Sequence, residues 1–400
     1  MPLVAHDPRS NGQIDRTGSQ GHMRVLLISH TCQSRTEGQP KAACLSAIPG
    51  VELCVVTPDR WKHYGKWRLA DPVSSDRFNC KISKVIWPWM GRALFYLHWY
   101  PALGKIIREF RPDVIDLWEE PWGLVSVQAC RLRRRLVPEA RIVSETEQNI
   151  NKQLPFPFER FRSYTLSRAD YAVGRNSESL EILRSKGYRG RAEVVPNAVD
   201  TELFHPMDRD ACRAKLGLKG FVAGYIGRLV EEKGLADMVD ALKSCSEEIN
   251  LLFVGAGEYE NALRQRIDHL GLTSRVVILP GRPLDQLPEI MNAIDVLVLP
   301  SRTTPSWKEQ FGRVIIEAHA CGTPVIGSNS GAIPEVVGDG GLVFEERDPS
   351  KLADALNTLS KDPERCHRMG EAGRAAVLER FTWQRVAERM HDIYARACSG

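Results

Sequence analysis

Short apolar runs that are typical of β-strands alternate with helical stretches along most of the chain. Strands and helices that alternate in this way build doubly wound α/β sheets. The runs fall into two sets, so we predict two Rossmann-like, doubly wound α/β domains. The expected strands are 24–29, 52–57, 84–87, 114–118, 141–145, 171–174 and 193–196 in the first set, and 221–226, 251–254, 276–279, 295–299, 324–327 and 341–344 in the second.

A polar, proline-ended segment, Asn197 to Pro206, separates the two sets and suits an interdomain linker. We therefore expect an N-terminal domain over residues 23–200, a C-terminal domain over residues 201–380, and a last helical stretch over residues 381–400. Residues 1–22 have little hydrophobic continuity and lack the apolar core of a signal peptide. We expect them to form a disordered extension or to be an expression remnant.

Two carboxylates, Glu309 and Glu317, lie eight residues apart where a predicted strand gives way to a helix. Glu309 lies in the polar loop after strand 295–299, and Glu317 lies about one turn into a helix expected over residues 314–321. Either residue alone would be an ordinary solvated glutamate. Together, at the carboxyl end of a strand, they can accept hydrogen bonds from sugar hydroxyls.

Two further features near these carboxylates favour an anion. The amides of Phe311 and Gly312 lie at the predicted helix start, where free N–H groups and the helix dipole attract negative charge. Arg228 and Lys233 follow the predicted strand 221–226, and they offer a bidentate fork and a point charge. Open α/β sheets bind ligands at this edge, so a diphosphate fits there.

These residues belong to the motifs G-R-L-V-E-E-K-G at 227–234, E-Q-F-G-R-V-I-I-E-A at 309–318 and G-T-P-V-I-G-S-N-S-G-A-I-P-E at 322–335. The combination resembles the nucleotide-sugar half of the family 4 retaining glycosyltransferases, which have the two-domain GT-B fold. The resemblance spans residues 23 to 400 and is strongest from Val194 onward.

The resemblance implies transfer of a sugar from a nucleoside-diphosphate sugar to a glycan, lipid-linked or small-molecule acceptor, with retention at the anomeric carbon. The implied donor contacts are Arg228 and Lys233 to the diphosphate, Glu309 to sugar hydroxyls, the Phe311 and Gly312 amides near the distal phosphate, and Glu317 to the ribose. Arg228, Lys233 and Glu309 would carry catalysis. In this family the linker joins the two halves, and the last helix would cross back to the N-terminal domain there.

Two glycine turns follow other strands of the second domain. Gly281 and Arg282 end a strand at the same edge of the sheet, so their backbone could face the nucleotide base, with an ordinary turn as the alternative. Gly255-Ala256-Gly257 also follows a strand but lacks the third glycine of a dinucleotide-binding loop. A nicotinamide site is therefore not expected.

The N-terminal half departs from the family pattern in two places. Members often carry a glycine pair after the first strand, where this chain offers only Gly38, and a histidine after the fifth strand, where it reads S-E-T-E-Q-N. Glu145 or Glu147 could take the place of that histidine, with capping or ion pairing as the alternative. His30 and His98 are further candidates, with a structural role as the alternative.

The implied reaction needs neither a side-chain base nor a metal. The departing diphosphate can itself accept the acceptor proton, and Arg228 with Lys233 would stabilise this leaving group. No paired-aspartate motif precedes a phosphate site in the sequence, so we expect metal independence and no cofactor besides the nucleoside-diphosphate sugar donor. The alternatives are a nucleotide-sugar epimerase of the same architecture and a sugar-nucleotide-binding protein that has lost turnover.

Positive charge and aromatic residues are concentrated in the N-terminal half. Residues 1–200 carry 30 Lys and Arg against 21 Asp and Glu, a net charge of +9, whereas the rest carries 24 against 29. An anionic or lipid-linked glycan acceptor is therefore expected there, with a core-facing helix stripe as the alternative for part of the aromatic segment. The expected stacking and basic residues are Trp61, Trp67, Trp87, Trp89 and Arg92.

Other features bear on partners and location. The basic run from Arg131 to Arg135 is expected to be a solvated helix face, with anionic membrane or polyanion as the alternative contact. No nucleic-acid-binding module accompanies the charge, so nucleic acid is not an expected partner. The ten cysteines show no metal-ligand spacing, which is typical of free thiols in a reducing cytoplasm. No apolar run reaches the roughly 18 residues of a membrane span, so no transmembrane helix is expected. We expect a cytoplasmic protein whose basic N-terminal surface makes peripheral contact with the inner face of the membrane.

Overall fold

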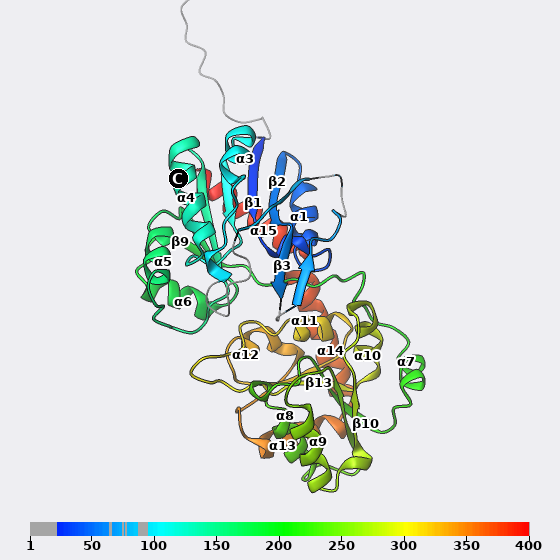
Figure 1. Ribbon diagram of the computed structural model, residues 1–400. Coiled ribbons are helices and arrows are strands. Elements are labelled where there is room, and N and C mark those ends of the chain that lie inside the picture. The colour runs from blue at the N-terminus through cyan, green and yellow to red at the C-terminus, as the bar shows by residue number, and fades with distance from the viewer. Residues whose placement is uncertain (1–21, 64–65, 74–75, 77, 87–94, 400) are drawn as a thin grey trace, which may run out of the picture.

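The computed structural model describes residues 22–63, 66–73, 76, 78–86 and 95–399, and it shows two α/β bodies, one above the other in Figure 1. The blue-to-green upper body holds the first sheet, and the green-to-orange lower body holds the second. The red helix at the end of the chain lies in the upper body. This architecture confirms the predicted class of two Rossmann-like domains.

A seven-stranded parallel sheet forms the centre of the N-terminal domain, in the order β5-β2-β1-β6-β7-β8-β9. Strands that are covered on both faces need nearly continuous apolar runs, and Val25 to Ile28 of β1 are fully buried. The strands are β1 Met23–Ile28, β2 Val51–Pro58, β5 Asn79–Ser83, β6 Val114–Leu117, β7 Arg141–Thr146, β8 Tyr171–Gly174 and β9 Arg191–Val194.

Helices cover both faces of this sheet because alternate side chains of each strand point to opposite sides. Val25 and Leu27 pack with α1 (Gln39–Ser46) and α15 (Trp383–Cys398). Leu26 and Ile28 pack on the other face with α3 (Leu103–Phe110) and α4 (Leu124–Leu136). The remaining helical elements of the domain are η1 Thr31–Gln33, η2 Phe95–Leu97, α5 Phe158–Leu166 and α6 Ser177–Ser185.

The structure corrects one predicted strand and adds a hairpin. The strand that pairs with β2 is β5, not residues 84–87; Ile86 forms only an isolated bridge with Trp99, and Trp87 lies outside the described residues. The apolar pattern misplaced this strand because β5 is an edge strand with mostly exposed side chains. The added hairpin joins β3 (Arg60–His63) to antiparallel β4 (Lys66–Leu69).

A six-stranded parallel sheet forms the centre of the C-terminal domain, in the order β12-β11-β10-β13-β14-β15. The strands are β10 Phe221–Ile226, β11 Ile249–Val254, β12 Val276–Leu279, β13 Val296–Leu299, β14 Val325–Ser328 and β15 Gly341–Phe344. The helical elements are α7 Arg209–Leu216, η3 Glu231–Lys233, α8 Leu235–Leu242, α9 Glu260–His269, η4 Thr273–Arg275, η5 Leu284–Gln286, α10 Leu287–Ala293, α11 Arg313–Ala320, α12 Ile333–Val337, η6 Gly338–Gly340, α13 Pro349–Ser360 and α14 Pro363–Arg380.

The chain crosses between the domains at two places that lie side by side. The linker residue Val199 donates its amide to the carbonyl of Phe381 at 2.9 Å and pairs with Thr382 in a parallel bridge. From Thr382 the helix α15 runs onto the N-terminal sheet, where the Tyr394 hydroxyl donates to Oδ2 of Asp116 at 2.7 Å. The two crossings are therefore held together by backbone contacts between the sheets.

Two findings concern the chain as a whole. Among the described helices, none is long and apolar enough to cross a bilayer. All ten cysteines are free thiols, as the sequence predicts.

His319 of α11 is buried in the C-terminal core, and its pKa is strongly shifted. Its Nε2 lies 3.1 Å from the carbonyl oxygen of Gly340, and its ring packs so closely that a Cβ on Gly340 or Gly373 would lie within 2.6 Å of it. Burial lowers the pKa of His319 to about 4 from an ordinary value of 6.5. The ring is therefore neutral in the folded protein and donates to Gly340.

Acidification should destabilise the protein through His319. Between pH 6.5 and pH 4 the unfolded chain takes up a proton at this ring and the folded chain does not, so stability falls as pH falls. The loss attributable to His319 should reach about 2 kcal/mol at pH 5. Urea unfolding of wild type and His319→Gln at pH 7 and pH 5 measures it, with His269→Gln on the exposed end of α9 as control. An unchanged pH dependence in His319→Gln would contradict the assignment.

Candidate functional site

The loops after β10 and β13 meet because their strands are neighbours in a parallel sheet. Gly234 ends the first loop with a φ of +67°, and a Cβ there would lie 2.0 Å from the carbonyl oxygen of Pro300 at the end of β13. The amide of Arg302 donates to the carbonyl of Glu232 at 2.8 Å, and the Arg302 guanidinium forms a bidentate ion pair with Asp237. These contacts hold the loop that carries Lys233 against the loop that carries Glu309.

Lys233 and Glu309 contact each other directly, with 2.5 Å between Nζ and Oε2. Oε2 of Glu309 also accepts the hydroxyl of Ser301 at 3.0 Å, and the Lys233 ammonium lies 4.8 Å from the centre of the Trp307 ring. Both side chains are mostly buried, with 15% and 11% of their surface exposed. The alternative that Glu309 is a solvated loop residue is therefore wrong.

The backbone of Glu309 is held from both domains. Its carbonyl oxygen accepts the side-chain amide of Asn149 at 2.7 Å, across the cleft, and the Ala332 amide at 3.1 Å. Gly331, at a φ of +57°, comes so close that a Cβ would lie 2.0 Å from the same carbonyl oxygen. A side chain at residue 331 would push the Glu309 loop away, which explains the glycine in the motif around it.

Arg228 lies in the same loop after β10 as Lys233, but it is exposed. Its carbonyl accepts the hydroxyl of the buried Tyr225 at 2.7 Å, which fixes the backbone at the end of β10. Gly281 and Arg282 are also exposed and follow β12. A Cβ on Gly281 would lie 3.8 Å from the Cα of Gly255, so the ends of β11 and β12 lie side by side.

Helix α11 begins after Gly312, which takes a left-handed φ of +79°. Phe311 is 4% exposed, and its ring lies 6.0 Å from that of Phe381, so this residue can serve a ligand only through its backbone. Glu317 is half-buried in the second turn of the helix. Burial raises the pKa of Glu317, and attraction to Arg313 opposes that shift.

A cavity of about 220 Å³, here called the cleft cavity, opens between the domains beside Gln310. Gln310 directly follows Glu309 in the sequence, so this lining residue is the chain neighbour of the Lys233–Glu309 pair. All other lining residues belong to the N-terminal domain. They are His30, Thr31, Tyr96, Trp118, Glu119, Glu120, Glu145, Thr146, Glu147 and Arg175.

His30 forms an ion pair with Glu119 at the mouth of this cavity. Glu119 accepts the His30 backbone amide at 2.6 Å and lies 2.8 Å from Nδ1 of the ring. Burial acts to lower the pKa of His30, but the Glu119 carboxylate outweighs it and raises that pKa. His98 is buried behind the pair, 3.9 Å from Glu119, and stacks edge-on against Trp61.

Glu145 and Glu147 have different surroundings. Glu145 is fully buried between Lys41, at 2.5 Å, and Arg175. Burial opposes its ionisation, but Arg175 and Lys41 outweigh burial and lower the pKa of Glu145 to about 2. Glu147 lies 3.6 Å from Nε of Arg175, and 41% of its side chain is exposed. Both glutamates therefore form ion pairs with Arg175, but Glu145 is buried and Glu147 is the one of the two whose carboxylate is exposed.

Of the expected aromatic platform, the structure describes two tryptophans, one buried and one exposed. Trp61 is 5% exposed and stacks on His30 at 4.7 Å between ring centres, so its prediction as an open stacking face is wrong. Tyr100, which belongs to the segment for which a core-facing helix stripe is the alternative, is fully buried but lies outside the helices η2 and α3. Trp67 is 47% exposed on the β3–β4 hairpin. The remaining three candidates, Trp87, Trp89 and Arg92, lie outside the described residues.

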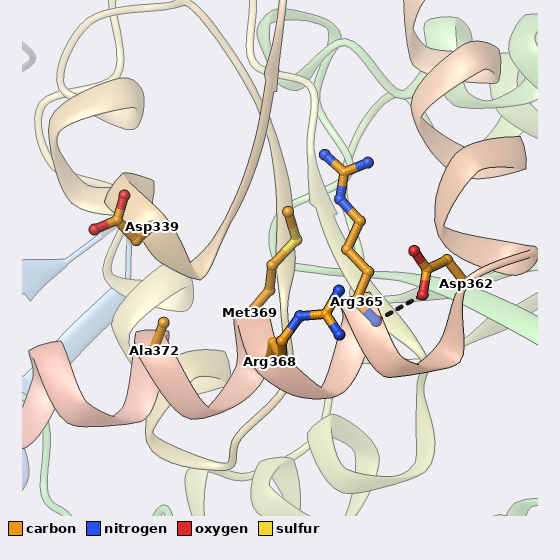
Figure 2. Close-up of a pocket in the computed structure, with 6 residues that line it drawn as sticks. All are labelled: Asp339, Asp362, Arg365, Arg368, Met369 and Ala372. Carbon is orange, nitrogen blue, oxygen red and sulfur yellow. Dashed lines mark hydrogen bonds between the residues drawn. The ribbon is translucent and has the colours of Figure 1, made fainter.

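A larger hollow of about 550 Å³ lies along α14, away from the strand ends. Figure 2 shows Arg365 and Met369 projecting from α14 into it, with Asp339 of η6 on the far side. The Asp362 carboxylate accepts the Arg365 amide at 2.9 Å and so caps the helix. This hollow joins no loop of the predicted site.

Sequence reasoning missed Asn149, Glu119 and Arg175. Asn149 and Glu119 follow predicted strands at the carboxyl edge of the first sheet, which was a usable signal, but nothing in the sequence paired Asn149 with a carbonyl of the other domain. Arg175 follows a strand as well, and its burial depends on Glu145. Within the described residues, no group of three or more His, Cys, Asp or Glu side chains is placed to hold a metal ion.

Two protein-family models match the chain. One, described as "Glycosyltransferase Family 4", matches residues 43–203, and the other, described as "Glycosyl transferases group 1", matches residues 208–376. The boundary between the two matches falls within the linker.

Named relatives and a solved structure are similar to the chain. A D-inositol 3-phosphate glycosyltransferase of Segniliparus rotundus is 33% identical over 52% of this chain and 48% of its own length. An alpha-maltose-1-phosphate synthase of Mycolicibacterium smegmatis is 32% identical over 52% of this chain and 57% of its own length. The chain thus matches about half the length of these relatives. A sucrose-phosphate synthase from Thermosynechococcus elongatus superposes with a TM-score of 0.72 at 21% identity, covering 94% of this chain and 99% of that one, which supports the fold.

Replacing Glu145 and Glu147 in turn should separate a structural carboxylate from an open one. Glu145→Gln leaves buried cations without their counter-charge and should lower the free energy of unfolding by about 3 to 5 kcal/mol. Glu147→Gln should leave it nearly unchanged, because the side chain is 41% exposed. Chemical denaturation of both variants measures this difference. Equal losses would show that the two carboxylates share one role.

Proposed function

The chain belongs to the family 4 glycosyltransferases, and we propose that it transfers a sugar from a nucleoside-diphosphate sugar to a hydroxyl of a carbohydrate, lipid-linked or small-molecule acceptor, with retention at the anomeric carbon. The donor would lie along the carboxyl ends of β10 and β13 and at the start of α11. The acceptor would approach from the N-terminal domain.

The contact between Lys233 and Glu309 carries this proposal. In a nucleoside-diphosphate sugar, a phosphate oxygen is bonded directly to the anomeric carbon, so negative charge and sugar hydroxyls lie side by side. A cation and a carboxylate that are 2.5 Å apart match that adjacency. Lys233 would bind the diphosphate, and Glu309 would accept hydrogen bonds from the sugar hydroxyls.

The rest of the donor would extend along the same edge of the sheet. Arg228 would hold the diphosphate with Lys233, and the Phe311 and Gly312 amides would bind the distal phosphate at the start of α11. Glu317, in the second turn of α11, would accept hydrogen bonds from the ribose. The Gly281–Arg282 turn at the end of β12 would face the base.

We propose that these positive groups take the place of a divalent metal. Negative charge develops on the diphosphate as its bond to the anomeric carbon breaks, and cations or helix N-termini that are fixed beforehand stabilise this charge. The diphosphate would then take the proton of the acceptor hydroxyl on the same face of the sugar. Retention follows because the leaving and attacking oxygens share that face.

An exposed surface on the N-terminal domain supports peripheral contact with an anionic membrane. Trp67 and Leu69 on β4 and Ile82 on β5 are 47%, 75% and 46% exposed. Exposed cations lie among them in the sequence, namely Arg60, Lys62, Arg68, Lys81 and Lys84. Apolar and cationic side chains together are typical of surfaces that bind lipid headgroups.

Removal of either cation should impair donor binding. Arg228→Ala and Lys233→Ala should each weaken nucleoside-diphosphate affinity and lower turnover by roughly 10²-fold or more, because each loses a charge-assisted contact to the diphosphate. Titration calorimetry and initial rates measure the two effects. Lys243→Ala, an exposed lysine just after α8, is the matched control and should behave as wild type. Wild-type affinity and turnover in either site variant would refute the diphosphate assignment.

Replacement of Glu309 and replacement of Glu317 should impair different steps. Glu309→Gln should lower turnover while leaving the affinity for free nucleoside diphosphate nearly intact, because its partner is the sugar. Glu317→Ala should weaken the bare nucleotide, because its partner is the ribose. Calorimetry with the nucleotide alone, beside initial rates with the donor, distinguishes the two. The same loss of nucleotide affinity in both variants would contradict the assigned roles.

A further inference from the structure

The cleft cavity lies where an acceptor must lie if the proposed function holds. Gln310 forms its wall on the donor side, and the neighbouring residue Glu309 is the proposed ligand of the donor sugar. Asn176 donates to the carbonyl of Gln310, and Asn149 donates to that of Glu309 at 2.7 Å, so this wall is fixed relative to the N-terminal domain. A molecule in the cavity therefore adjoins the sugar that would be transferred.

Cations that line the cavity are engaged by protein groups. Arg175 is 2% exposed; its Nη1 donates to the carbonyl of Val195 at 3.1 Å and its Nη2 pairs with Glu145. Its Nε makes no hydrogen bond to a described residue but forms an ion pair with Glu147 at 3.6 Å. Among the described lining residues, His30 is the other basic side chain, and its Nδ1 lies 2.8 Å from Glu119. Lys41 lies behind the wall between Glu145 and Asp116 and is 1% exposed.

Carboxylates, in contrast, face the space. Glu147 has 41% of its side chain exposed. Glu120 is half-buried; its Oε2 accepts the Thr146 hydroxyl at 2.6 Å and its Oε1 accepts the Glu147 amide at 3.0 Å. Burial raises the pKa of Glu120 to about 7, so this carboxyl can both accept and donate hydrogen bonds at neutral pH. Thr31, Tyr96 and Gln310 add uncharged polar groups.

We propose that the cleft cavity binds the acceptor and selects an uncharged, hydroxyl-rich molecule over one that carries a phosphate, with Glu147 and Glu120 as hydrogen-bond partners of its hydroxyls and with the Glu147 carboxylate as the group that repels phosphate. This inference rests on the proposed function and names its acceptor class. It differs from the anionic acceptor that the charge of the N-terminal half predicts, because the excess cations of the described residues do not line this cavity.

The transfer balances with such an acceptor. A bond forms between the acceptor hydroxyl oxygen and the anomeric carbon, and the bond from that carbon to the diphosphate oxygen breaks. The diphosphate leaves with the electron pair and takes the hydroxyl proton.

A phosphate on the acceptor would have to lie beside Glu147 in a cavity whose arginine is already paired. Two similar proteins have names that include phosphorylated compounds, and this cavity predicts the opposite preference for the present chain.

The test uses the full chain and matched acceptors. UDP-glucose, GDP-mannose and ADP-glucose are first screened for acceptor-independent hydrolysis, which reports on the donor site alone. The active donor is then offered inositol or inositol 3-phosphate, and mannose or mannose 6-phosphate. Wild type should favour the uncharged member of each usable pair by roughly tenfold or more in kcat/KM, since repulsion acts on one member only.

Variants at one position make the test specific. Glu147→Lys should shift the ratio of kcat/KM towards the phosphorylated member by roughly tenfold or more, because it replaces repulsion by attraction. Glu147→Gln should shift it less, in the same direction. Both should keep the wild-type unfolding temperature. The ratio compares two acceptors on the same variant, so any change in donor hydrolysis cancels from it. Glu139→Lys makes the same charge change on the exposed turn after α4 and should leave the ratio unchanged.

The outcomes separate the two proposals. Intact hydrolysis with a wild-type preference for phosphorylated acceptors, or a Glu147→Lys ratio equal to that of wild type, would overturn the inference alone. Absence of hydrolysis and transfer with every donor would overturn the proposed function, and the inference with it.

Discussion

The 2.5 Å contact between Lys233 and Glu309 is the interaction on which the arrangement of the site depends. It joins two loops that lie 76 residues apart in the chain and that follow neighbouring strands of one parallel sheet. Holding a lysine and a glutamate largely out of water costs free energy unless the two are paired and hydrogen-bonded. The ion pair and the hydrogen bond from Ser301 offset that cost. Gly234 and Gly331 let the backbones of the two loops approach closely enough for the pair to form. The motifs around these residues are therefore requirements of packing as well as of binding.

The second domain contributes by fixing the position of this pair. Asn149 donates across the cleft to the Glu309 backbone, and the buried pairs of Glu145 with Lys41 and Arg175 hold the strand end that carries Asn149. Tyr394 extends the same buried network to the last helix through Asp116. Since the linker and the start of α15 run side by side at Val199 and Thr382, a rotation there would change the cleft while preserving each sheet. Charge that is buried inside the N-terminal domain thus shapes the cleft, while most of the positive charge on the described residues of that domain lies away from the cleft cavity.

Strand positions in the cores could be predicted because strands covered on both faces need apolar runs, and the fold class follows from their alternation with helices. The edge strand β5 could not, because its side chains are mostly exposed. In the site, the loops that follow the strand ends and carry Arg228, Lys233 and Glu309 could be recognised from the sequence. The contact of Lys233 with Glu309 could not be predicted. Glu145 and Glu147 look equivalent in the sequence; one is buried by two cations that come from distant segments, and the other is open. Trp61 was misjudged for the same reason, since its partners His30 and His98 are distant in the chain.

The central claim is that the chain's own cations and the start of α11 stabilise the diphosphate, so that it leaves and takes the proton on one face of the sugar. Proton NMR of the first-formed product, with the reaction run in excess chelator, tests this claim most directly. The account predicts that transfer proceeds and that the product has the anomeric configuration of the donor. A product of inverted configuration, or a reaction that stops in chelator and resumes only with added magnesium or manganese, would contradict it.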